Sequence, residues 1–525
     1  MLGPLPTLVA SPPAATKPNI VFIYADDWGW GDLSCHGHPW LKTPNLDRLA
    51  SEGIGFRQFN VLNPVCSPSR TAATTGLYPA RFCIHQHFAP GQNTERGMPD
   101  WLDPKAPTLA RFLKNAGYRT GHFGKWHLTN TGAAGAPPPS AYGFDESAVF
   151  NGPGPQAGLH NTARNAVRFI RESKGGPFYV NVWLHESHTP HVPTPDSMAK
   201  WKHLDEQKQV YAAVITDGDN AVGQVLAALK EAGVEENTIV IFSSDNGPEW
   251  TGKNKYFGPK DAPPGSRGYD TYYSVGSTGG LRGRKRSLFE GGVRVPFIVR
   301  WPGHTPAGAK NEKTVVTAVD LLPTLCAAAG VKLSDDYRGD GENLLDAFNG
   351  KEAARTRPIF WEWRGNKTEP DWWPRLAVRD DDWKLAMTYD ARRVELHQLI
   401  DDRAESKDVS KENPEIVARL SKLVLDWKSS LPGKPNPDCI SKSPPAPATP
   451  ATKGKPTPQT GKPKAAVDRG KIFDAWNTNQ DGVLSLEEYK AGLKNPSDAE
   501  ERFKRFDKNG DGVLSREEFV NPSGK

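Results

Sequence analysis

Short stretches of uninterrupted apolar residues recur along the chain, separated by polar segments rich in glycine and proline. In residues 19–24 (NIVFIY), every side chain after the first is apolar. A strand without apolar–polar alternation is buried on both faces, as in a parallel sheet covered by helices. Between these stretches apolar residues recur with helical periodicity, which predicts an α/β fold. The expected strands are residues 19–24, 177–184, 237–243 and 297–301, and the expected helices are residues 44–53, 107–117 and 211–233.

Three more apolar segments follow in the last third of the chain, at residues 358–363, 376–380 and 383–389. They lie too close together for helices to connect them, so they predict a small antiparallel sheet. Residues 414–427 have one apolar face and predict a helix that packs on this sheet. A smaller subdomain is therefore expected after the main α/β core.

The chain has 525 residues, too many for one compact core. Residues 434–464 are mostly proline, lysine, alanine and threonine, the composition of an extended linker. Part of the small net charge of +5 lies in this linker, so the charge gives little support for nucleic-acid binding. No apolar run approaches the roughly 20 residues that a membrane span requires.

Beyond the linker, residues 477–488 and 507–518 each match the twelve-residue calcium loop of an EF-hand. Both segments carry oxygen-bearing side chains at positions 1, 3, 5 and 12 and a glycine at position 6. The first loop begins with asparagine rather than aspartate, so we expect it to bind calcium more weakly. The expected ligands are Asn477, Asn479, Asp481, Val483 and Glu488 in the first loop and Asp507, Asn509, Asp511, Val513 and Glu518 in the second.

Carboxylate and amide side chains directly follow two of the predicted parallel strands. Asp26 and Asp27 follow the first strand, and Asp245 and Asn246 follow the strand that ends at residue 243. Neighbouring parallel strands end at one edge of a sheet, where open α/β folds bind ligands. All four side chains offer oxygen, which suits Ca²⁺, and less well Mg²⁺, better than zinc. Either pair alone is equally compatible with a solvated turn.

Cys66 opens the sequence CSPSR, which a run of small residues follows through Gly76. Serine and proline favour helix starts, so Cys66 is expected to be the last loop residue before a helix. The free N–H groups at such a position favour an anion. Arg70, one turn later, is expected to point back toward Cys66.

Basic residues gather in two other segments. Lys125 and His127 would project to one face of an extended segment and could bind an anion together. Lys285 lies in the basic run at residues 281–287, which is either an anion-binding element or a solvated loop.

Three histidines, His185, His188 and His191, follow the strand at residues 177–184. They are compatible with a metal site, a set of proton donors or a polar loop. Pro190 breaks any helix there, which disfavours a helical zinc motif.

The five cysteines are scattered and form no CxxC pair, so no disulfide framework is expected. Residues 1–17 lack a positive charge before Lys17 and contain several prolines, which makes a poor secretory signal. This segment is interpreted as a leader or the remnant of a signal.

CSPSR and the small residues after it resemble the signature of the type I sulfatases, in which this cysteine is oxidised to formylglycine. The resemblance extends from about Asn19 to Trp427 and includes both metal-ligand pairs, the GKWH segment, the His-Thr-Pro segment and the basic segment from Arg282 to Arg294. Residues 28–81 look most like the N-acetylgalactosamine-6-sulfatase and arylsulfatase A branch. The resemblance implies an alkaline-phosphatase-like mixed, mainly parallel sheet flanked by helices. The implied domains are a leader or signal remnant (1–17), a catalytic domain (18–335), a C-terminal subdomain (336–432), a linker (433–468) and an EF-hand pair (469–525).

The resemblance also implies roles for individual residues. Cys66, as hydrated formylglycine, would supply the attacking hydroxyl beside a Ca²⁺ ion. Arg70 and Lys125 would fix the hydrate, and His127 would take a proton from its second hydroxyl. His188 and Lys285 would grip the sulfate and protonate the leaving oxygen. The implied metal ligands are Asp26, Asp27, Cys66, Asp245 and Asn246.

The segment around Lys285 departs from the family pattern, because Arg284 and Arg286 stand where smaller residues are usual. With the tyrosines of the preceding loop they would form subsites for a polyanionic sulfated sugar, or belong to a mobile surface loop. These tyrosines are Tyr256, Tyr269, Tyr272 and Tyr273.

Three other functions are compatible with parts of the pattern. A phosphatase or phosphodiesterase of the same superfamily would normally carry serine or threonine at position 66 and prefer zinc. An unconverted Cys66 would leave a silent binding protein, and a scaffold would depend mainly on the EF-hand pair.

The expected partners are a sulfated small molecule or glycan, the enzyme that generates formylglycine, and a calcium-dependent docking partner for the EF-hands. Calcium concentrations that keep such loops filled occur outside the cytosol, so a periplasmic or secreted location is expected.

Overall fold

The computed structural model describes residues 17–89, 91–130, 132–151, 161–173, 175–257, 268–365, 373–442, 469–479, 481–493, 499–507 and 509–520. The chain forms two compact units, residues 1–451 and residues 452–525, and each is described by itself. The expected leader, apart from Lys17, and residues 443–468 of the expected linker lie outside the described residues.

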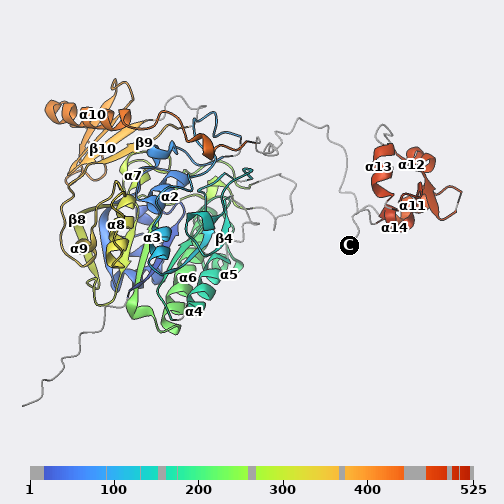
Figure 1. Cartoon of the computed structure of the whole chain (residues 1–525), viewed down its shortest axis with the longest axis horizontal. Helices are drawn as coiled ribbons and strands as arrows, with labels where there is room; N and C mark the ends of the chain where they lie inside the picture. The colour runs from blue at the N-terminus through green and yellow to red at the C-terminus, as the bar shows by residue number, and fades with distance from the viewer. Residues whose placement is uncertain are drawn as a thin grey trace, which may run out of the picture. The chain divides into compact units, whose positions relative to one another are not determined.

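The first unit is built on an eight-stranded sheet with the strand order β4-β3-β5-β1-β6-β7-β2-β8. Its two edge strands, β4 and β8, are labelled in Figure 1. All neighbouring pairs are parallel except those that β7 makes with β6 and β2. The expected mixed, mainly parallel sheet is thus confirmed. The strands are β1 (Asn19–Ala25), β2 (Ile54–Asn60), β3 (Arg119–Lys125), β4 (Glu146–Phe150), β5 (Phe178–Trp183), β6 (Thr238–Ser244), β7 (Phe297–Arg300) and β8 (Ala309–Thr317).

The continuous apolar sequence of β1 follows from its central place in this sheet. Ile20, Phe22 and Tyr24 belong to the core on one face, and Val21 and Ile23 belong to the core on the other. Strands near the sheet edges lack this signal. The strand β4 is mostly exposed, and the first half of β8 is polar, so neither was predicted.

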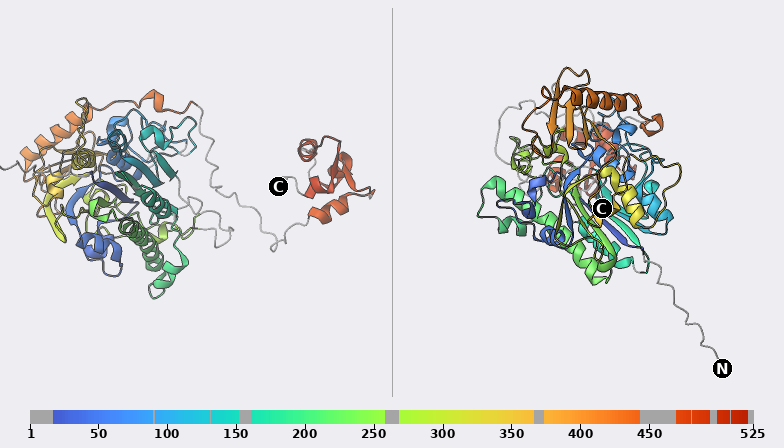
Figure 2. Two further views of the ribbon diagram at one scale, coloured as in Figure 1. Left: turned by 60° about the horizontal axis from the view of Figure 1, so that its bottom comes forward. Right: turned by 90° about the vertical axis from the view of Figure 1, so that its left-hand side faces the viewer.

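Helices cover both faces of the sheet, as Figure 2 shows from two further directions. One face packs against α1 (Pro44–Ser51), α4 (Asn161–Glu172) and α6 (Glu206–Glu231), and α5 (Pro195–Lys200) packs on α6. The other face packs against α2 (Cys66–Thr75), α3 (Leu109–Asn115), α8 (Leu321–Ala328) and α9 (Leu345–Phe348). Short 3-10 helices are η1 (Trp30–Asp32), η2 (Ser34–His36), η3 (Pro79–Phe82), η4 (Pro139–Tyr142), η6 (Glu235–Asn237), η8 (Thr271–Tyr273), η9 (Ala318–Asp320) and η10 (Pro437–Cys439).

The predicted small antiparallel sheet is present, with the strand order β12-β11-β10-β9. The helix α10 (Pro414–Ser429) packs on β10 and β11, and its Trp427 stacks on Phe360 at 5.0 Å between ring centroids. A buried ionic cluster joins this sheet to α7 (Glu290–Val293): Lys384 Nζ lies 2.8 Å from Glu290 and 3.1 Å from Glu405. The strands are β9 (Ile359–Glu362), β10 (Leu376–Asp380), β11 (Trp383–Met387) and β12 (Val394–Gln398), of which β12 was not predicted.

Residues 433–442, expected to begin the linker, pack on the preceding part of the first unit. The Asp100 N–H donates to the Cys439 carbonyl at 2.7 Å, and the Ser441 N–H donates to the Asp100 carboxylate at 2.9 Å. Cys439 is buried. This segment is therefore part of the folded body.

The second unit has its own core, formed by Phe473, Leu484, Tyr489, Phe503, Leu514 and Phe519 among others. Its two calcium-loop segments are joined by antiparallel pairing of Val483–Ser485 with Val513–Ser515. In the described parts of the chain, no helix is long and apolar enough to cross a membrane. The elements are α11 (Arg469–Trp476), β13 (Val483–Ser485), α12 (Leu486–Gly492), α13 (Ala499–Phe506), β14 (Val513–Ser515) and α14 (Arg516–Val520).

Candidate active site

The two predicted oxygen-ligand pairs lie side by side because β1 and β6 are adjacent and parallel. Ala25 pairs with Ser244, so the residues that follow both strands emerge at one edge of the sheet. Carboxylate oxygens of Asp26, Asp27 and Asp245 all lie within 4.8 Å of one another. That separation is about twice a Ca²⁺–oxygen distance, so one ion can contact all three carboxylates.

Two buried oxygen atoms favour a cation at this place. Oδ1 of Asp26 and Oδ1 of Asn246 have no hydrogen-bond partner among the described residues. The Asn246 amide is oriented by donating from Nδ2 to Asp27 at 2.6 Å. Asp27 adopts a left-handed backbone (φ 62°), in which aspartate is less strained than most residues. An oxygen-only donor set with unpaired buried atoms fits a hard divalent cation.

Cys66 begins the helix α2, which corrects the expectation that it ends the preceding loop. Val65 is extended and acts as the N-cap, and the Ser69 N–H donates to its carbonyl at 3.3 Å. Pro68 is tolerated in the first turn, where its missing N–H has no helical partner. Burial raises the pKa of the Cys66 thiol, so the thiol is not activated as a thiolate nucleophile.

Three cationic side chains match the three carboxylates. Lys125 Nζ lies 2.5 Å from Asp26, Lys285 Nζ lies 2.7 Å from Asp27, and Arg70 Nη2 lies 2.7 Å from Asp245. All six side chains are buried. Arg70, expected to point toward Cys66, thus binds the carboxylate of Asp245, a candidate metal ligand.

The charges set the protonation of these groups. Burial alone would raise the pKa of Asp26, but Lys125 and the two nearest histidines hold it well below its usual value. Burial and the Asp26 charge raise the pKa of Asp245 to about 7. Burial opposes the charge of Lys285, yet Asp27 and Glu249 raise its pKa above the usual lysine value. Lys285 therefore remains charged at neutral pH.

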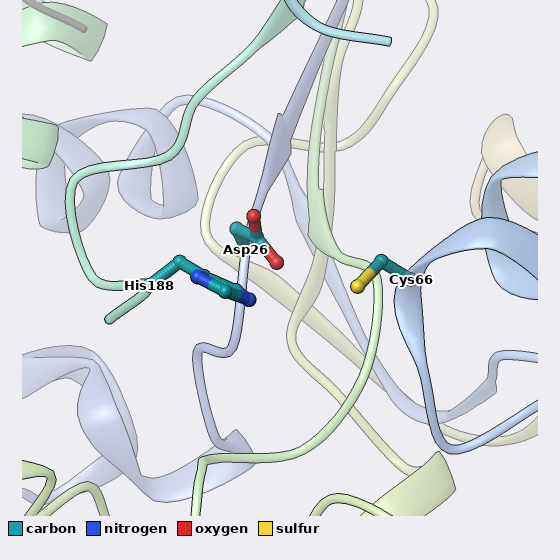
Figure 3. Close-up of side chains that lie close together, drawn as sticks. All are labelled: Asp26, Cys66 and His188. Atoms are coloured by element: carbon teal, nitrogen blue, oxygen red, sulfur yellow. The ribbon is translucent and has the colours of Figure 1, made fainter. Parts of the chain in front are cut away.

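Asp26, Cys66 and His188 point toward one another from a strand end, a helix start and a loop (Figure 3). His188 Nε2 lies 3.9 Å from Asp27 Oδ2, and its ring stacks on His185 at 4.6 Å. His185 Nδ1 lies 2.5 Å from Asp26 Oδ2. His191 turns away and bonds Ser274 at 3.1 Å. The three histidines therefore have three different environments.

The backbone conformation that places His127 in the site differs from the one that the sequence predicts. The strand β3 ends at Lys125, and His127 adopts a left-handed backbone (φ 48°). The expectation that both side chains project from one extended strand is therefore wrong, although both face the same pocket. Burial, Lys125 and His87 lower the pKa of His127 well below its usual value, so the imidazole is neutral.

Candidate catalytic side chains line a pocket of about 300 Å³.

The sequence analysis did not identify Glu249, which follows Asp245 by four residues and has the local pattern of a solvated acidic residue. Its carboxylate pairs with Arg286 and lies 3.4 Å from Lys285 Nζ. The lining residues are Cys66, His87, Phe88, Ala89, Lys125, His127, Asn151, His185, His188, Thr189, Glu249, Lys285 and Arg286.

The second unit presents its candidate calcium ligands on two loops. Gly482 and Gly512 have φ values of 88° and 82°, as the sharp turn at position 6 of an EF-hand loop requires. Asn477 Oδ1 is buried without a hydrogen-bond partner among the described residues. Glu488 and Glu518, at position 12 of each loop, accept hydrogen bonds from Ser485 and Ser515.

Fold and site together define an α/β protein whose pocket places basic side chains, which suit an anionic group, beside candidate oxygen ligands for a cation. The chain belongs to the sulfatase family, a family of sulfuric ester hydrolases. The Sulfatase family model matches residues 18–331, the N-sulphoglucosamine sulphohydrolase C-terminal model matches residues 283–429, and the EF hand model matches residues 499–521.

Individual relatives agree with this membership. The chain is 27% identical over 508 residues to the N-acetylgalactosamine-6-O-sulfatase of Bacteroides thetaiotaomicron, with 79% of this chain and 93% of the relative covered. It is 33% identical to human arylsulfatase A, with 67% of this chain and 72% of that protein covered. The crystal structure of Ps i-CgsB in complex with k-i-k-neocarrahexaose superposes with a TM-score of 0.66 at 28% identity, covering 78% of this chain and 93% of that one.

Proposed function

We propose that this sulfatase hydrolyses sulfate esters of a sulfated sugar, using a formylglycine made from Cys66 and a Ca²⁺ ion held by Asp26, Asp27, Asp245 and Asn246. One observation carries the proposal. An oxygen-only cluster, the Cys66 side chain and the basic groups Lys125, His188 and Lys285 converge on one buried site.

Calcium would supply a fixed positive charge against the sulfate oxygens and the attacking hydroxyl. Lys125, beside Asp26, and Lys285, beside Asp27, would add further positive charge. His127 is neutral and has a ring nitrogen, Nδ1, without a hydrogen-bond partner among the described residues, so it can accept a proton.

Burial lowers the pKa of His188, and Lys125 and Lys285 lower it further. A bound sulfate would favour the protonated imidazole, which could then donate to the leaving oxygen. Arg70 would hold Asp245 in place through Nε and Nη2, while its buried Nη1, which has no hydrogen-bond partner among the described residues, would remain available to the hydrate.

A formylglycine hydrate explains why cysteine occupies this position. After sulfate transfer, the remaining hydroxyl of the hydrate can expel sulfate by collapse to the aldehyde, so no second attack at sulfur is needed. The CSPSR segment would serve as the recognition sequence of the modifying enzyme.

Several relatives are named N-acetylgalactosamine-6-sulfatases. A sulfated glycan is therefore the proposed substrate class. The EF-hand pair would bind calcium and dock to a partner or matrix outside the cytosol, in the periplasm or in the secreted state. The expected partner enzyme is the one that generates formylglycine.

Mass spectrometry of the peptide that carries Cys66, with assays on an aryl sulfate and an aryl phosphate, tests the proposal. We expect an aldehyde or its hydrate at Cys66, release of sulfate, and no turnover by Cys66→Ala. Robust phosphate release by a protein with an unmodified thiol would instead favour a phosphatase.

A further inference from the structure

Trp250 combines high exposure with a fixed orientation at the rim of the catalytic pocket. Its side chain is 51% exposed, and among the described tryptophans it is the only one in the set of exposed large apolar side chains. Its indole Nε1–H donates to the Lys285 carbonyl at 2.8 Å. Its backbone N–H donates to the Glu249 carboxylate at 2.8 Å. An apolar ring is thus held open to solvent by two residues that line the pocket.

The segment that contains Lys285, the hydrogen-bond acceptor of the indole, is also held by backbone hydrogen bonds. The Lys285 N–H donates to the Pro248 carbonyl at 3.1 Å, and the Arg286 N–H donates to the Pro64 carbonyl at 3.0 Å. The second bond ties this segment to Pro64, two residues before Cys66. The indole face is therefore preorganised relative to the sulfate-binding groups.

The two arginines that flank Lys285 are already engaged. Arg286 forms two hydrogen bonds with the Glu249 carboxylate. The Arg284 guanidinium donates to the carbonyls of Glu249 and Gly276. These contacts engage both guanidinium groups, whereas the indole of Trp250 is open to solvent.

We propose that Trp250 is the stacking platform for the sugar ring linked to the sulfated sugar, so that the enzyme prefers sulfated oligosaccharides over single sulfated sugars. This inference rests on the proposed sulfatase function. A pocket of about 300 Å³ lies at the small end of ligand sites, so a second sugar must lie outside it, at the rim. One face of a pyranose ring consists of C–H groups, which pack on an exposed aromatic ring.

Calorimetric titration of the full-length Cys66→Ala protein tests binding without turnover. The ligands are 6-O-sulfated N-acetylgalactosamine and a tetrasaccharide that ends in the same sulfated sugar. We expect the tetrasaccharide to bind more tightly, and Trp250→Ala to weaken it by about tenfold, equal to about 1.4 kcal/mol. Trp250→Phe should retain much of the affinity, and neither change should affect the monosaccharide.

Trp201→Ala is the matched control. Trp201 is also partly exposed and anchored through its indole N–H, but its acceptor, Thr216, does not line the pocket, whereas the acceptor of Trp250, Lys285, does. We expect it to bind both sugars like the parent. Equal affinity of the parent for the two sugars, or an unchanged tetrasaccharide affinity in Trp250→Ala, would overturn the platform.

Kinetics with the converted enzyme separate this inference from the function on which it rests. We expect Trp250→Ala to raise KM for the tetrasaccharide while leaving kcat/KM for an aryl sulfate within about twofold. Absence of aryl sulfate turnover in the parent would refute the proposed function. If Trp250→Ala lowered kcat/KM equally for the tetrasaccharide and the aryl sulfate, the stacking platform would be refuted but the sulfatase function would not.

Discussion

The Nζ atom of Lys125 lies 2.5 Å from Oδ2 of Asp26, and both side chains are almost completely buried. Lys125 therefore offsets the charge of Asp26, a proposed metal ligand, and lines the pocket proposed to bind sulfate. We predict that Lys125→Met lowers kcat for an aryl sulfate by about 100-fold or more, the usual loss when one preorganised donor is removed. Steady-state kinetics with thermal unfolding would measure this.

The matched control is Lys114→Met, which removes a surface ion pair with Asp145 at 2.6 Å. Exposed pairs contribute about 0–1 kcal/mol, so this variant should keep both activity and melting temperature. Parent-like turnover in Lys125→Met would contradict the role given to Lys125.

Aryl sulfate turnover should require calcium bound at the proposed oxygen ligands of the catalytic unit. We predict that chelation with EGTA abolishes aryl sulfate turnover and that Ca²⁺ restores it better than Mg²⁺, because the site offers several carboxylate and amide oxygens. Asp245→Ala should not recover. Because Ca²⁺ would also fill the EF-hands, the same titration on a chain truncated after Lys442 distinguishes the two sites. Full activity at zero free Ca²⁺ would exclude a catalytic calcium.

The EF-hand pair should bind calcium without affecting catalysis on small substrates. Glu488→Gln and Glu518→Gln each remove a position-12 carboxylate, and we expect Glu518→Gln to cost more total affinity because its loop begins with Asp507. Calorimetry on the full-length chain measures this. Aryl sulfate turnover should be unchanged in both variants, and a larger loss in Glu488→Gln would contradict the ranking.

Truncation should be made after Lys442 and not after Leu431, because residues 436–441 bond to Asp100 and Asp103. A chain that ends at Lys442 should keep the activity and melting temperature of the catalytic unit. A chain that ends at Leu431 should unfold at a lower temperature. Equal melting temperatures would contradict a structural role for this segment.

Glu362 makes stability depend on pH. Burial would raise its pKa, but His85, Arg364 and Lys428 outweigh burial and lower it from 4.5 to about 2. Because burial also lowers the pKa of His85 to about 3, the lowering at neutral pH comes from Arg364 and Lys428. A carboxylate with a lowered pKa in the folded state stabilises above its unfolded pKa and loses this contribution as the pH falls. We predict that Glu362→Gln is less stable at pH 7 by up to about 3 kcal/mol, and that the difference narrows between pH 4.5 and 2.

Urea unfolding across this pH range measures the difference. Glu412→Gln, at an exposed position, is the control and should have the stability of the parent. A constant difference between Glu362→Gln and the parent would contradict the assignment.

The ionic cluster of Lys384, Glu290 and Glu405 should stabilise the packing of the small sheet against α7. Lys384→Met leaves the carboxylates of Glu290 and Glu405 buried without their shared cation. Breaking one partner of a buried ion pair costs about 3–5 kcal/mol, so we predict a loss of this size in urea unfolding. Lys351→Met, which removes an exposed pair with Asp346, is the control, and equal stability of the two variants would contradict the prediction.

The sequence by itself determined the features that depend on local pattern. Buried strands have continuous apolar runs, so β1, β5 and β6 were predictable, and with them the edge at which Asp26 and Asp245 meet. The CSPSR segment and the calcium loops are equally local, because spacing within a few residues defines them. Edge strands such as β4 and β8 escaped prediction because half-exposed strands carry little apolar signal.

Only the tertiary structure decided how the remaining side chains meet. It directed His191 away from the site, gave His127 its left-handed backbone, and paired Glu249 with Arg286 and Lys285. These relationships join residues from different loops, and a charged residue in a loop has the same local pattern whether it is solvated or buried against a partner. The physical reason is that burial and pairing are properties of the packed chain, and they decide which groups carry charge at the site.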